Sequence, residues 1–592
     1  MNVSRLFDIP YFQLVNAPQE SSLVTKHAGK WVVISTQELV QLINQVSRGL
    51  LRLEVKKGDH IAILSPNNST EWLIIDFAIQ QIGAVTIPIY PNLSDPDLKF
   101  ILKHSNSKFC FVSGMELVNK IQRINLDSIH LKNIFTFENL DHLISLDSIK
   151  ELGNDLSNQK EVEKIKQNIH PEHLATIIYT SGTTGSPKGV MLSHKNLLSD
   201  ALNTHERVII ENSGIIKMLS FLPICHVLER MVVYLAMYRS YNIYFAESIE
   251  KVPEHLKEIK PHIMTVVPRV IEKLYSTIYQ KGTSSGWIQK HIFLWALKIG
   301  HNFQPFTSTS LSYKIVNQLV FKKWREGLGG EIKTIISGGA PLSKNLNKIF
   351  FAAGLPILEG YGLTETSPVI AVNGKDKNLF KFGTVGPLLK DMKVKIAEDG
   401  EILTQGPNVF MGYYNEEDKT KEAFTDDGWF KTGDIGEMDG IFLKITDRKK
   451  EIFKTSGGKF ITPQITENLL KQSRFIEQAM VVGAGEKMPC ALIQPNFLFI
   501  QKYLVRKNLI ENKREFSNQE LIENVTIKDR IWKEVEKVNM TLGNWEQIKK
   551  IELTPCIWSM EGGELTPTLK LKRKFIKEKY IDLYNKMYEK NL

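Results

Sequence analysis

Cysteine is scarce in this chain, whose 592 residues include only four cysteines. Cys110, Cys225, Cys490 and Cys556 are scattered, and no C-x-x-C pair occurs among them. Structural zinc sites need closely spaced ligands, and domains held together by disulfides are rich in cysteine. We therefore expect no structural zinc site, and we expect a protein of a reducing compartment.

Long uninterrupted apolar runs are also absent. Residues 1–10 lack an apolar core of signal-peptide length. The most apolar windows carry or border charge, because residues 72–90 contain Asp76 and residues 231–238 lie between two arginines. Neither window can span a bilayer, which takes about 20 apolar residues. We expect a cytoplasmic protein, and peripheral contact with the inner face of a membrane stays open.

A strong charge imbalance is missing as well. The sequence has 75 lysines and arginines against 65 acidic residues, a net charge of +10. This modest excess favours anionic substrates, such as nucleotides or CoA, or a lipid headgroup surface. It does not predict a nucleic-acid partner, because neither an arginine-rich arm nor a nucleic-acid-binding module is visible.

The composition that remains, 42% hydrophobic and 24% charged, is typical of a globular protein. The length exceeds what one core supports, so we expect two or more domains. Helical and strand patterns alternate over residues 32–112, which predicts parallel sheets covered by helices. Short strands beyond Gly383 predict a β-rich subdomain. After a charged joint at residues 441–450, about 140 residues are enough for a small second domain.

The most informative stretch is residues 176–194, where an apolar strand breaks into a loop of hydroxyls and glycines. Glycine lets backbone N–H groups turn toward one point, and hydroxyls add further donors. The residues of this kind are Thr180, Ser181, Gly182, Thr183, Thr184, Gly185 and Gly189. Lys188 adds a positive charge, so the loop is suited to polyphosphate. It is not the common P-loop, because Pro187 stands where that motif has glycine.

Two further glycine-rich loops each follow a short apolar strand. Residues 332–337 lead into Gly338, Gly339 and Ala340, and residues 355–358 lead into a loop at residues 359–366. Ligands of open parallel sheets bind beyond the carboxyl ends of the strands. The three loops therefore point to one shared crevice.

Residues 282–330 form a basic and aromatic stretch that we expect to be helical. Its aromatic residues are Trp287, Phe293, Trp295, Phe303, Phe306, Tyr313, Phe321 and Trp324. Two interpretations stay open: they are core residues under a cap, or part of the stretch lines or gates a long apolar tunnel.

With these loops placed, the chain resembles the adenylate-forming (AMP-forming) acyl-CoA synthetase superfamily, and within it the long-chain fatty acid–CoA ligases most of all. The resemblance runs from about residue 32 to residue 574. The motifs that carry it occur in order at residues 179–189, 222–230, 337–341, 360–365, 432–434, 447–448 and 565–570. It implies an α/β fold: a large domain of stacked parallel-rich sheets with a β-rich subdomain (1–446), and a small mobile C-terminal α+β domain (447–592).

The resemblance also implies a reaction in two steps with ATP, Mg²⁺ and CoA. The carboxylate of a fatty acid attacks the α-phosphate of ATP and pyrophosphate leaves; the CoA thiol then attacks the acyl-adenylate and AMP leaves. Two anions must approach each other in the first step, so its catalysis depends mainly on positioning and charge neutralisation. The alternatives are transfer to a carrier protein and a catalytically silent nucleotide- or lipid-binding homologue. A monomer and a homodimer both stay open.

By the same resemblance, each loop has a role in holding ATP. Residues 180–188 hold the β- and γ-phosphates, and Glu365 with Thr184 binds Mg²⁺. Gly338, Gly339 and Ala340 lie under the adenine, and Tyr361 stacks on it. Asp434 and Arg448 bind the ribose. The loop that carries Tyr361 supplies the other expected nucleotide-binding residues, which are Glu359, Gly360, Gly362 and Thr364.

The resemblance assigns the chemistry to the C-terminal domain. Lys570 bridges the carboxylate and the α-phosphate, although Lys572, Arg573 and Lys574 lie beside it. The small domain then rotates about Lys450. Its second face, formed by Lys454, Gly457 and Gly458, serves the CoA step. His226 closes the acyl pocket or thiol channel as a positioning residue, and a direct role in proton transfer stays open.

Overall fold

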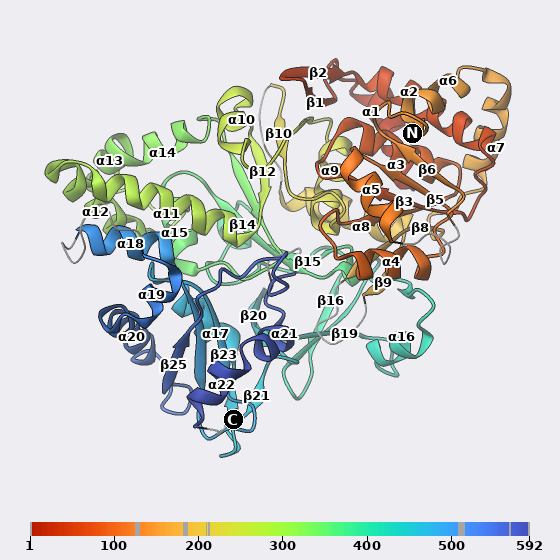
Figure 1. Cartoon of the computed structure of the whole chain (residues 1–592). Helices are drawn as coiled ribbons and strands as arrows, with labels where there is room; N and C mark the ends of the chain where they lie inside the picture. Colours follow the sequence, from red (N-terminus) through yellow and green to blue (C-terminus); the bar gives the residue numbers. More distant parts are fainter. Residues whose placement is uncertain are drawn as a thin grey trace.

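The structure is a computed structural model that describes residues 3–124, 131–180, 187–208, 210, 214–506, 516–566 and 570–589. Two eight-stranded sheets make up most of the N-terminal part, and a four-stranded antiparallel sheet follows them. The C-terminal residues form a smaller unit at the bottom of Figure 1. The predicted α/β class, with a large part of parallel-rich sheets and a smaller C-terminal part, is confirmed.

The first eight-stranded sheet contains the strand that leads into the predicted phosphate loop. Its strands are buried along most of their length, as expected for a sheet covered on both faces. Pairing is parallel from β8 to β7 and antiparallel at β8–β9 and β9–β18. The strand order is β18 (Gly412–Tyr413), β9 (Lys188–Ser193), β8 (Leu174–Thr180), β4 (Val85–Ile89), β3 (His60–Leu64), β5 (Phe109–Val112), β6 (Asn133–Thr136) and β7 (Ile144–Ser145).

The second eight-stranded sheet carries the other two predicted loops. All of its strand pairs are parallel except those of the two edge strands, β15 and β2. The strand order is β15 (Val369–Val372), β14 (Ile357–Gly362), β13 (Thr334–Ser337), β12 (Ile263–Val266), β10 (Lys217–Ser220), β11 (Asn242–Phe245), β1 (Leu23–His27) and β2 (Lys30–Ile34).

Helix α9 (Val227–Tyr238) lies between the two sheets and contacts β10 and β11 of the second. Its residues 227–237 are all buried, because the helix is apolar nearly all round. The first sheet meets it through α8 (His194–Arg207) and through α3 (Thr70–Gln81), whose Gln80 is hydrogen-bonded to Tyr234 of α9. The apolar window at residues 231–238 is therefore an internal helix. No helix of the described ranges is long and apolar enough to cross a membrane.

A buried ionic network joins α9 to the first sheet. The guanidinium of Arg230 lies 2.5 Å from Asp76 Oδ1, and both side chains are fully buried. Arg230 also donates to Tyr234 Oη at 2.8 Å and to Thr176 Oγ1 at 2.9 Å. Thr176 lies on β8, so the network links α3, α9 and the strand that leads into the phosphate loop. Asp76 receives a further hydrogen bond from Thr86 of β4 at 2.8 Å.

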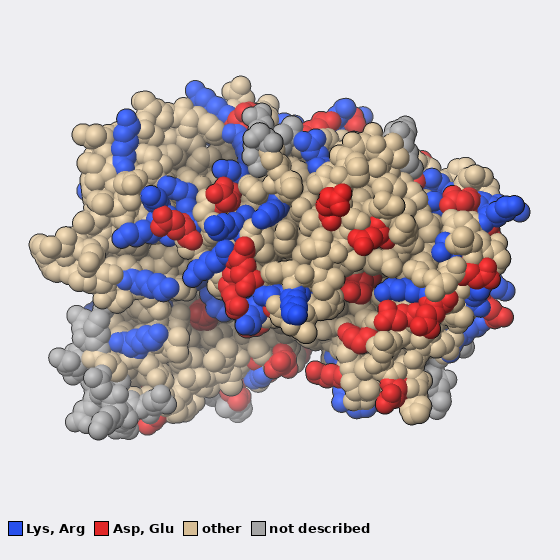
Figure 2. All heavy atoms as spheres, turned by 90° about the horizontal axis from the view of Figure 1, so that it is seen from above, with Lys and Arg blue, Asp and Glu red and all other residues tan. Residues whose placement is uncertain are grey.

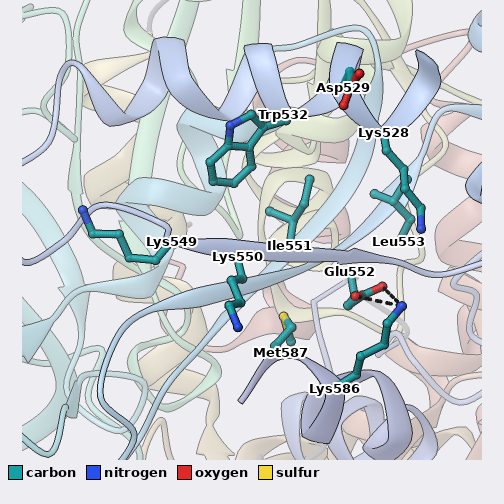
Figure 3. Close-up of a pocket in the computed structure, with 10 residues that line it drawn as sticks. All are labelled: Lys528, Asp529, Trp532, Lys549, Lys550, Ile551, Glu552, Leu553, Lys586 and Met587. Atoms are coloured by element: carbon teal, nitrogen blue, oxygen red, sulfur yellow. Dashed lines mark hydrogen bonds and ion pairs between the residues drawn. The ribbon is translucent and has the colours of Figure 1, made fainter. Parts of the chain in front are cut away.

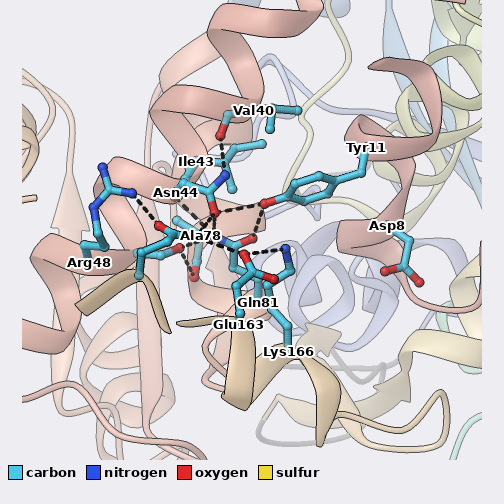
Figure 4. A network of polar contacts seen from close by, with 12 residues as sticks. Asp8, Tyr11, Val40, Ile43, Asn44, Arg48, Ala78, Gln81, Glu163 and Lys166 are labelled. Carbon is cyan, nitrogen blue, oxygen red and sulfur yellow. Dashed lines mark hydrogen bonds and ion pairs between the residues drawn. The ribbon is translucent and has the colours of Figure 1, made fainter. Parts of the chain in front are cut away.

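The N-terminal helix α1 (Ile9–Asn16) is held by a second polar network (Figure 4). The hydroxyl of Tyr11 lies 3.0 Å from Asn44 Oδ1 and 2.9 Å from Gln81 Oε1. The ammonium of Lys166 lies over the Tyr11 ring, 3.9 Å from its centre. The network therefore ties α1 to α2 (Thr36–Arg52), α3 and α7 (Gln159–Gln167).

A layer of helices covers the second sheet at the left of Figure 1. Its elements are α11 (Pro268–Ser284), α12 (Trp287–His301), α13 (Leu311–Val316), the π-helical turn η4 (Asn317–Phe321), α14 (Lys322–Gly327) and α15 (Lys344–Ala352). Phe293, Phe321 and Trp324 belong to the core beneath this layer, as the core interpretation predicts. Trp287 and Trp295 do not, because they are exposed.

The remaining strands form the predicted β-rich subdomain and the C-terminal unit. The subdomain has β16 (Lys393–Ile396), β17 (Glu401–Gln405), β19 (Phe430–Asp439) and β20 (Phe442–Arg448). The C-terminal unit has the hairpin β21 (Phe453–Lys454) and β22 (Phe460–Ile461), and a sheet of β23 (Ile476–Val482), β24 (Cys490–Pro495) and β25 (Lys550–Leu553). Its helices are α17 (Pro463–Leu470), α18 (Phe497–Arg506), α19 (Asn518–Glu523), α20 (Val525–Asn539), α21 (Arg573–Lys579) and α22 (Ile581–Met587).

The Asp76–Arg230 pair yields a stability prediction. We expect Arg230→Met to lower the free energy of unfolding by about 3–5 kcal/mol, because it leaves the Asp76 carboxylate buried without its partner. The double variant Asp76→Leu/Arg230→Met should lose less than the sum of the two single changes. Denaturant unfolding measures both. Removing the exposed pair Lys150–Asp147 is the control and should cost at most about 1 kcal/mol. Additive losses at Asp76 and Arg230 would contradict the prediction.

Candidate active site

The three predicted loops converge, but they do not come from one sheet. The phosphate loop follows β8 of the first sheet, the two other loops follow β13 and β14 of the second, and Asp434 and Arg448 lie on the four-stranded sheet. The pKa of Lys570, from the C-terminal unit, is influenced by the charges of Arg448, Asp434, Glu451 and Glu365. The shared crevice predicted from the sequence corresponds to a junction between three sheets and the C-terminal unit.

The phosphate loop is the connection of a β-hairpin. Thr180, the last residue of β8, pairs with Lys188, the first residue of β9, at the base of the loop. Ser181, Gly182, Thr183 and Thr184 lie outside the described residues, so the structure does not place them. The pKa of Lys188 is lowered by burial and by the charges of Lys450 and Lys419, while Glu365 and Glu416 oppose the shift. The side chain of Lys188 thus lies at the base of the loop in a partly buried position among other charged groups.

Tyr413 connects Lys188 to Glu365, and the sequence analysis missed it. Its hydroxyl donates to Glu365 Oε1 at 2.9 Å, and its ring lies 4.6 Å from the ammonium of Lys188. Tyr413 reaches this position because β18 pairs with β9, which places it opposite Val190. A two-residue strand has no recognisable pattern in the sequence, so no local signal could have identified it.

Glu365 is a candidate Mg²⁺ ligand. It lies in the 3₁₀ turn Thr364–Thr366 after β14, and its backbone carbonyl accepts a hydrogen bond from Phe410 N at 2.9 Å. The described ranges contain no group of three or more His, Cys, Asp or Glu that could hold a metal ion. A single carboxylate nevertheless fits Mg²⁺, which is bound in nucleotide sites by one or two carboxylates together with phosphate oxygens. The proposed partner Thr184 lies outside the described residues.

Small residues are required where β13 and β14 end. Gly339 has φ +82°, a left-handed conformation that favours glycine. A Cβ on Gly338 would lie 3.1 Å from Leu228 of α9, and a Cβ on Gly362 would lie 1.6 Å from the carbonyl oxygen of Pro368. Gly338 is buried against Leu228, whereas Gly339 and Ala340 are exposed at the carboxyl end of β13.

Of the other predicted residues on this loop, Glu359 is buried and supports the strand. Asn347 of α15 donates to its Oε1 at 2.8 Å, and burial raises the pKa of Glu359 to about 7. Gly360 is partly buried beside Val372 of β15, and Thr364 is buried at the start of the 3₁₀ turn. These contacts shape the loop that presents Tyr361.

Tyr361, Asp434 and Arg448 form one cluster. The Tyr361 hydroxyl donates to Asp434 Oδ2 at 2.8 Å, and Arg448 Nε lies 3.3 Å from Asp434 Oδ1. Asp434 and Arg448 are directly paired in the β19–β20 hairpin. Burial raises the pKa of Asp434, while Arg448, Tyr361 and Lys570 oppose the shift. A buried carboxylate beside a guanidinium is suited to hydroxyl groups such as those of a ribose.

Lys570 brings the C-terminal unit to this cluster. Its backbone is held by Thr566, whose N–H donates to the carbonyl of Lys570 at 2.8 Å and whose Oγ1 accepts from Lys570 N at 3.0 Å. Burial, together with the charge of Arg448, lowers the pKa of Lys570 to about 8.

The basic residues beside Lys570 point to other partners. Arg573 pairs with Glu467 at 2.6 Å and with Glu451 at 3.0 Å. Lys574 is exposed and lies 4.0 Å from Glu578. The geometry therefore separates Lys570 from this run, which the sequence left ambiguous.

His226 is the N-cap of α9, where its Nδ1 accepts from Leu228 N at 3.2 Å. Burial and the charge of Lys570 lower the pKa of His226 to about 4. The imidazole is therefore neutral at neutral pH, and one of its nitrogens is committed to the helix. This environment fits a positioning residue that lies close to Lys570.

The expected CoA-step residues lie on a different part of the C-terminal unit. Lys454 is exposed, and its ammonium lies 4.5 Å from the centre of the Phe460 ring across the β21–β22 hairpin. Gly457 and Gly458 form the turn of this hairpin, where Gly458 has φ +74°. Lys450, the expected pivot, is exposed two residues after Arg448. The structure brings Lys570, rather than the Lys454 hairpin, to Asp434.

Known structures share this arrangement of sheets and C-terminal unit. ATP-bound MatB from Rhodopseudomonas palustris is 21% identical, with 99% of this chain and 100% of that chain covered and a TM-score of 0.71. A fatty acyl CoA synthetase from Mycobacterium tuberculosis is 20% identical, with 98% of each chain covered and a TM-score of 0.63. At this level of identity the likeness establishes the fold.

Sequence comparison identifies the family. Residues 13–414 match the model of the AMP-binding enzymes, and residues 450–592 match that of their C-terminal domain. The long-chain-fatty-acid–CoA ligase FadD15 of Mycobacterium bovis is 33% identical, over 95% of this chain and 93% of its own length. The long chain acyl-CoA synthetase 3 of Arabidopsis thaliana is 30% identical, over 96% and 89%. The chain belongs to the AMP-binding enzyme family, which confirms the predicted resemblance to the adenylate-forming acyl-CoA synthetases.

Proposed function

We propose that the protein activates a long-chain fatty acid to acyl-AMP with release of pyrophosphate, and then transfers the acyl group to CoA, giving acyl-CoA and AMP. The observation that carries this proposal is that Lys570 is buried where the charges of Arg448, Asp434 and Glu365 reach it. The curated relatives support the substrate class, because they are named as long-chain ligases and synthetases.

The first step requires two anions to approach, so the site must neutralise charge and hold both reactants in place. Lys570 lies between the carboxylate and the α-phosphate, and Lys188 holds the β- and γ-phosphates with residues 180–184. Asp434 and Arg448 bind the ribose, and Tyr361 stacks on the adenine, which lies against Gly338, Gly339 and Ala340. Mg²⁺ bound by Glu365 and Thr184 supplies charge stabilisation to the phosphates.

The second step uses another face of the C-terminal unit, which we assign to residues 447–592, with residues 1–446 as the large domain. The unit rotates about Lys450 and replaces Lys570 by Lys454, Gly457 and Gly458. Contacts that hold the present arrangement can be exchanged, because they lie at the surface. Arg474 stacks on Tyr279 of α11 at 3.6 Å from the ring centre, and Arg269 pairs with Glu477.

The two alternatives are not favoured. No carrier-domain serine motif follows Lys570, the Gly457–Gly458 loop favours CoA, and the curated relatives are named as CoA ligases and synthetases. A silent homologue would not need Lys188, Glu365, Asp434 and Lys570 all in place.

The chain-length profile tests the substrate class. Pyrophosphate release with free CoA should increase with acyl length, because each buried methylene contributes about 0.8 kcal/mol, which is about fourfold in kcat/KM. We expect turnover with C12–C18 acids to exceed that with C2–C4 acids by about a hundredfold or more. The absence of acyl-CoA from every C12–C18 acid would rule out the proposal. Adenylate formation without thioester formation from CoA would favour the carrier-protein alternative.

The two faces predict two different kinetic defects. Lys570→Ala should lower the adenylation rate, measured by ATP–pyrophosphate exchange, by about 100- to 1000-fold, because it removes charge where the anions meet. Lys454→Ala should leave this exchange within about threefold of native and slow thioester formation from added acyl-adenylate. Lys574→Ala, at an exposed lysine of the same basic run, is the matched control and should change neither rate. Equal loss of one and the same step in both variants would disprove the two-face mechanism.

The pH profile follows from the pKa of Lys570. The charged ammonium is the active form, so it predominates below its pKa of about 8 and is lost as the pH rises through that value. We expect kcat/KM for adenylation to be level near neutral pH and to fall toward tenfold per pH unit above about 8. His226, with a pKa of about 4, should add no inflection near its usual value of 6.5.

Lys570→Arg is the matched variant for this profile. The descending limb of its residual activity should move to higher pH, since a guanidinium stays charged. A native profile that stays level to about pH 10 would exclude Lys570 as the titrating group.

A further inference from the structure

One end of the helical layer exposes an apolar surface, which we call the docking face. It consists of Trp287, Ile288, Leu294 and Trp295 of α12, and of Leu311, Ile315 and Leu319 of α13 and η4. Trp287 and Leu311 are each 75% exposed, and Ile288 is 65% exposed. The two helical segments are in contact, so their outer residues belong to one region of the surface. Single exposed apolar residues are normal, but a cluster with two tryptophans indicates an interaction surface.

Helix α12 is apolar on both of its faces. Phe293, Ala296 and Leu297 are buried against the rest of the helical layer. The opposite face carries Trp287 and Trp295, at positions where an ordinary surface helix has polar side chains. The inner face alone packs α12 onto the rest of the molecule, so packing within the fold does not explain why the outer face is also apolar. In α13 and η4 the exposed residues Leu311, Ile315 and Leu319 recur every four residues, which places them on one side of the helix.

The segment that forms the docking face carries positive charges only, and the nearest acidic residues in the sequence are Glu272 and Glu326. Residues 273–325 contain seven lysines and one arginine but no aspartate or glutamate, whereas the whole chain has a net charge of +10. Lys298 and Lys314 are exposed and lie on α12 and α13 themselves. Within the described ranges, no ion pair is formed by Lys290, Lys298 or Lys314 at the distances that define one. Figure 2 shows blue lysine and arginine atoms among tan atoms at this end of the molecule (left), with few red ones.

We propose that the docking face binds the surface of an anionic phospholipid bilayer. Tryptophan side chains are stable at the level of the headgroups, because the ring is apolar and the indole N–H is polar. Lysines beside them reach the phosphates, and each adds about fivefold to the partition coefficient at an anionic surface. A second copy of this chain is a poorer occupant, because a symmetric dimer would bring two positively charged faces together.

The docking face is connected to the active site by α11. This helix begins directly after Val267, whose Cγ1 is 3.9 Å from the position that a Cβ would take on Gly339. At its other end α11 packs on α12, where a Cβ on Gly282 would meet the ring of Phe293 at 2.5 Å. Under the proposed function, a docked bilayer therefore supplies fatty acid on the side of the molecule where the helical layer borders the site. Bilayer binding itself does not depend on that function.

A second basic region of the molecule provides a matched control. A hollow of about 340 Å³ on the C-terminal unit is lined by Lys528, Lys549, Lys550 and Lys586 (Figure 3). Acidic residues accompany these lysines, since Lys586 pairs with Glu552 at 3.0 Å and Asp529 lies in the same lining. Because this hollow is concave and carries charges of both signs, we do not expect it to bind the flat anionic surface of a bilayer.

Co-sedimentation of the full chain with vesicles tests the proposal without turnover, so a failure of the proposed function would not affect the result. The vesicles contain phosphatidylcholine alone or with about 30% phosphatidylglycerol. We expect the native protein to bind the anionic vesicles at least about tenfold more tightly, and to lose this preference between about 0.05 and 0.5 M salt. Lys290→Glu/Lys298→Glu/Lys314→Glu should weaken binding by about tenfold or more, and Trp287→Ser/Trp295→Ser should do the same.

The control variants are Lys528→Glu/Lys549→Glu/Lys550→Glu for charge and Val525→Ser/Met540→Ser for exposed apolar area, and both should bind as the native protein does. Equal binding to both kinds of vesicle, or binding that the docking-face substitutions leave unchanged, would overturn the proposal. The proposal would also be overturned if the native protein did not bind vesicles but formed dimers that the docking-face substitutions abolish. If a docking-face variant fails to fold, the native protein is mixed with vesicles of brominated anionic lipid and its tryptophan fluorescence is measured. Quenching supports the proposal, and the absence of quenching overturns it.

Discussion

The buried pairing of Arg230 with Asp76 is the interaction on which the architecture of the large domain depends. It lies where α9 passes between the two eight-stranded sheets, and both charges are fully removed from water. Such a pair is favourable only when every remaining polar group has a partner, and Tyr234, Thr176 and Thr86 supply those partners. Helix α9 is therefore fixed in rotation and position. Its first turn sets His226 close to Lys570 and Leu228 beneath Gly338.

The site follows from this fixed frame, because each sheet delivers one part of it. Loops that follow strands of different sheets can face one another only if the two sheets keep a fixed relative position. Helix α9, which packs between the sheets, fixes that position. The small C-terminal unit completes the site with one cation, whose low pKa results from burial beside Arg448. Under the proposed function, the large domain supplies the preorganised anion-binding surface, and the C-terminal unit changes its position between the two steps.

Charge is distributed unevenly between the inside and the outside of the molecule. At the candidate active site, cations and carboxylates lie together: Lys188 is influenced by Glu365, and Lys570 by Arg448, Asp434 and Glu365. On the helical layer, residues 273–325 carry cations without any acid. Mixed charge orients a small polar ligand, whereas charge of one sign beside exposed tryptophans suits an extended anionic surface.

The sequence by itself determined the order of the loops, the α/β class and most of the candidate site, because glycine and charge at the ends of apolar strands are local signals. It did not reveal Tyr413, whose contact with Glu365 depends on the pairing of β18 with the distant strand β9. Nor did it separate Lys570 from its basic neighbours, or decide which aromatic residues of the stretch at 282–330 lie in the core. Only the tertiary structure distinguishes these residues from their neighbours, because burial, ion pairing and exposure depend on what packs against a residue. Phe293 is buried against other helices of the layer and Trp295 is exposed, although one residue alone separates them in the chain.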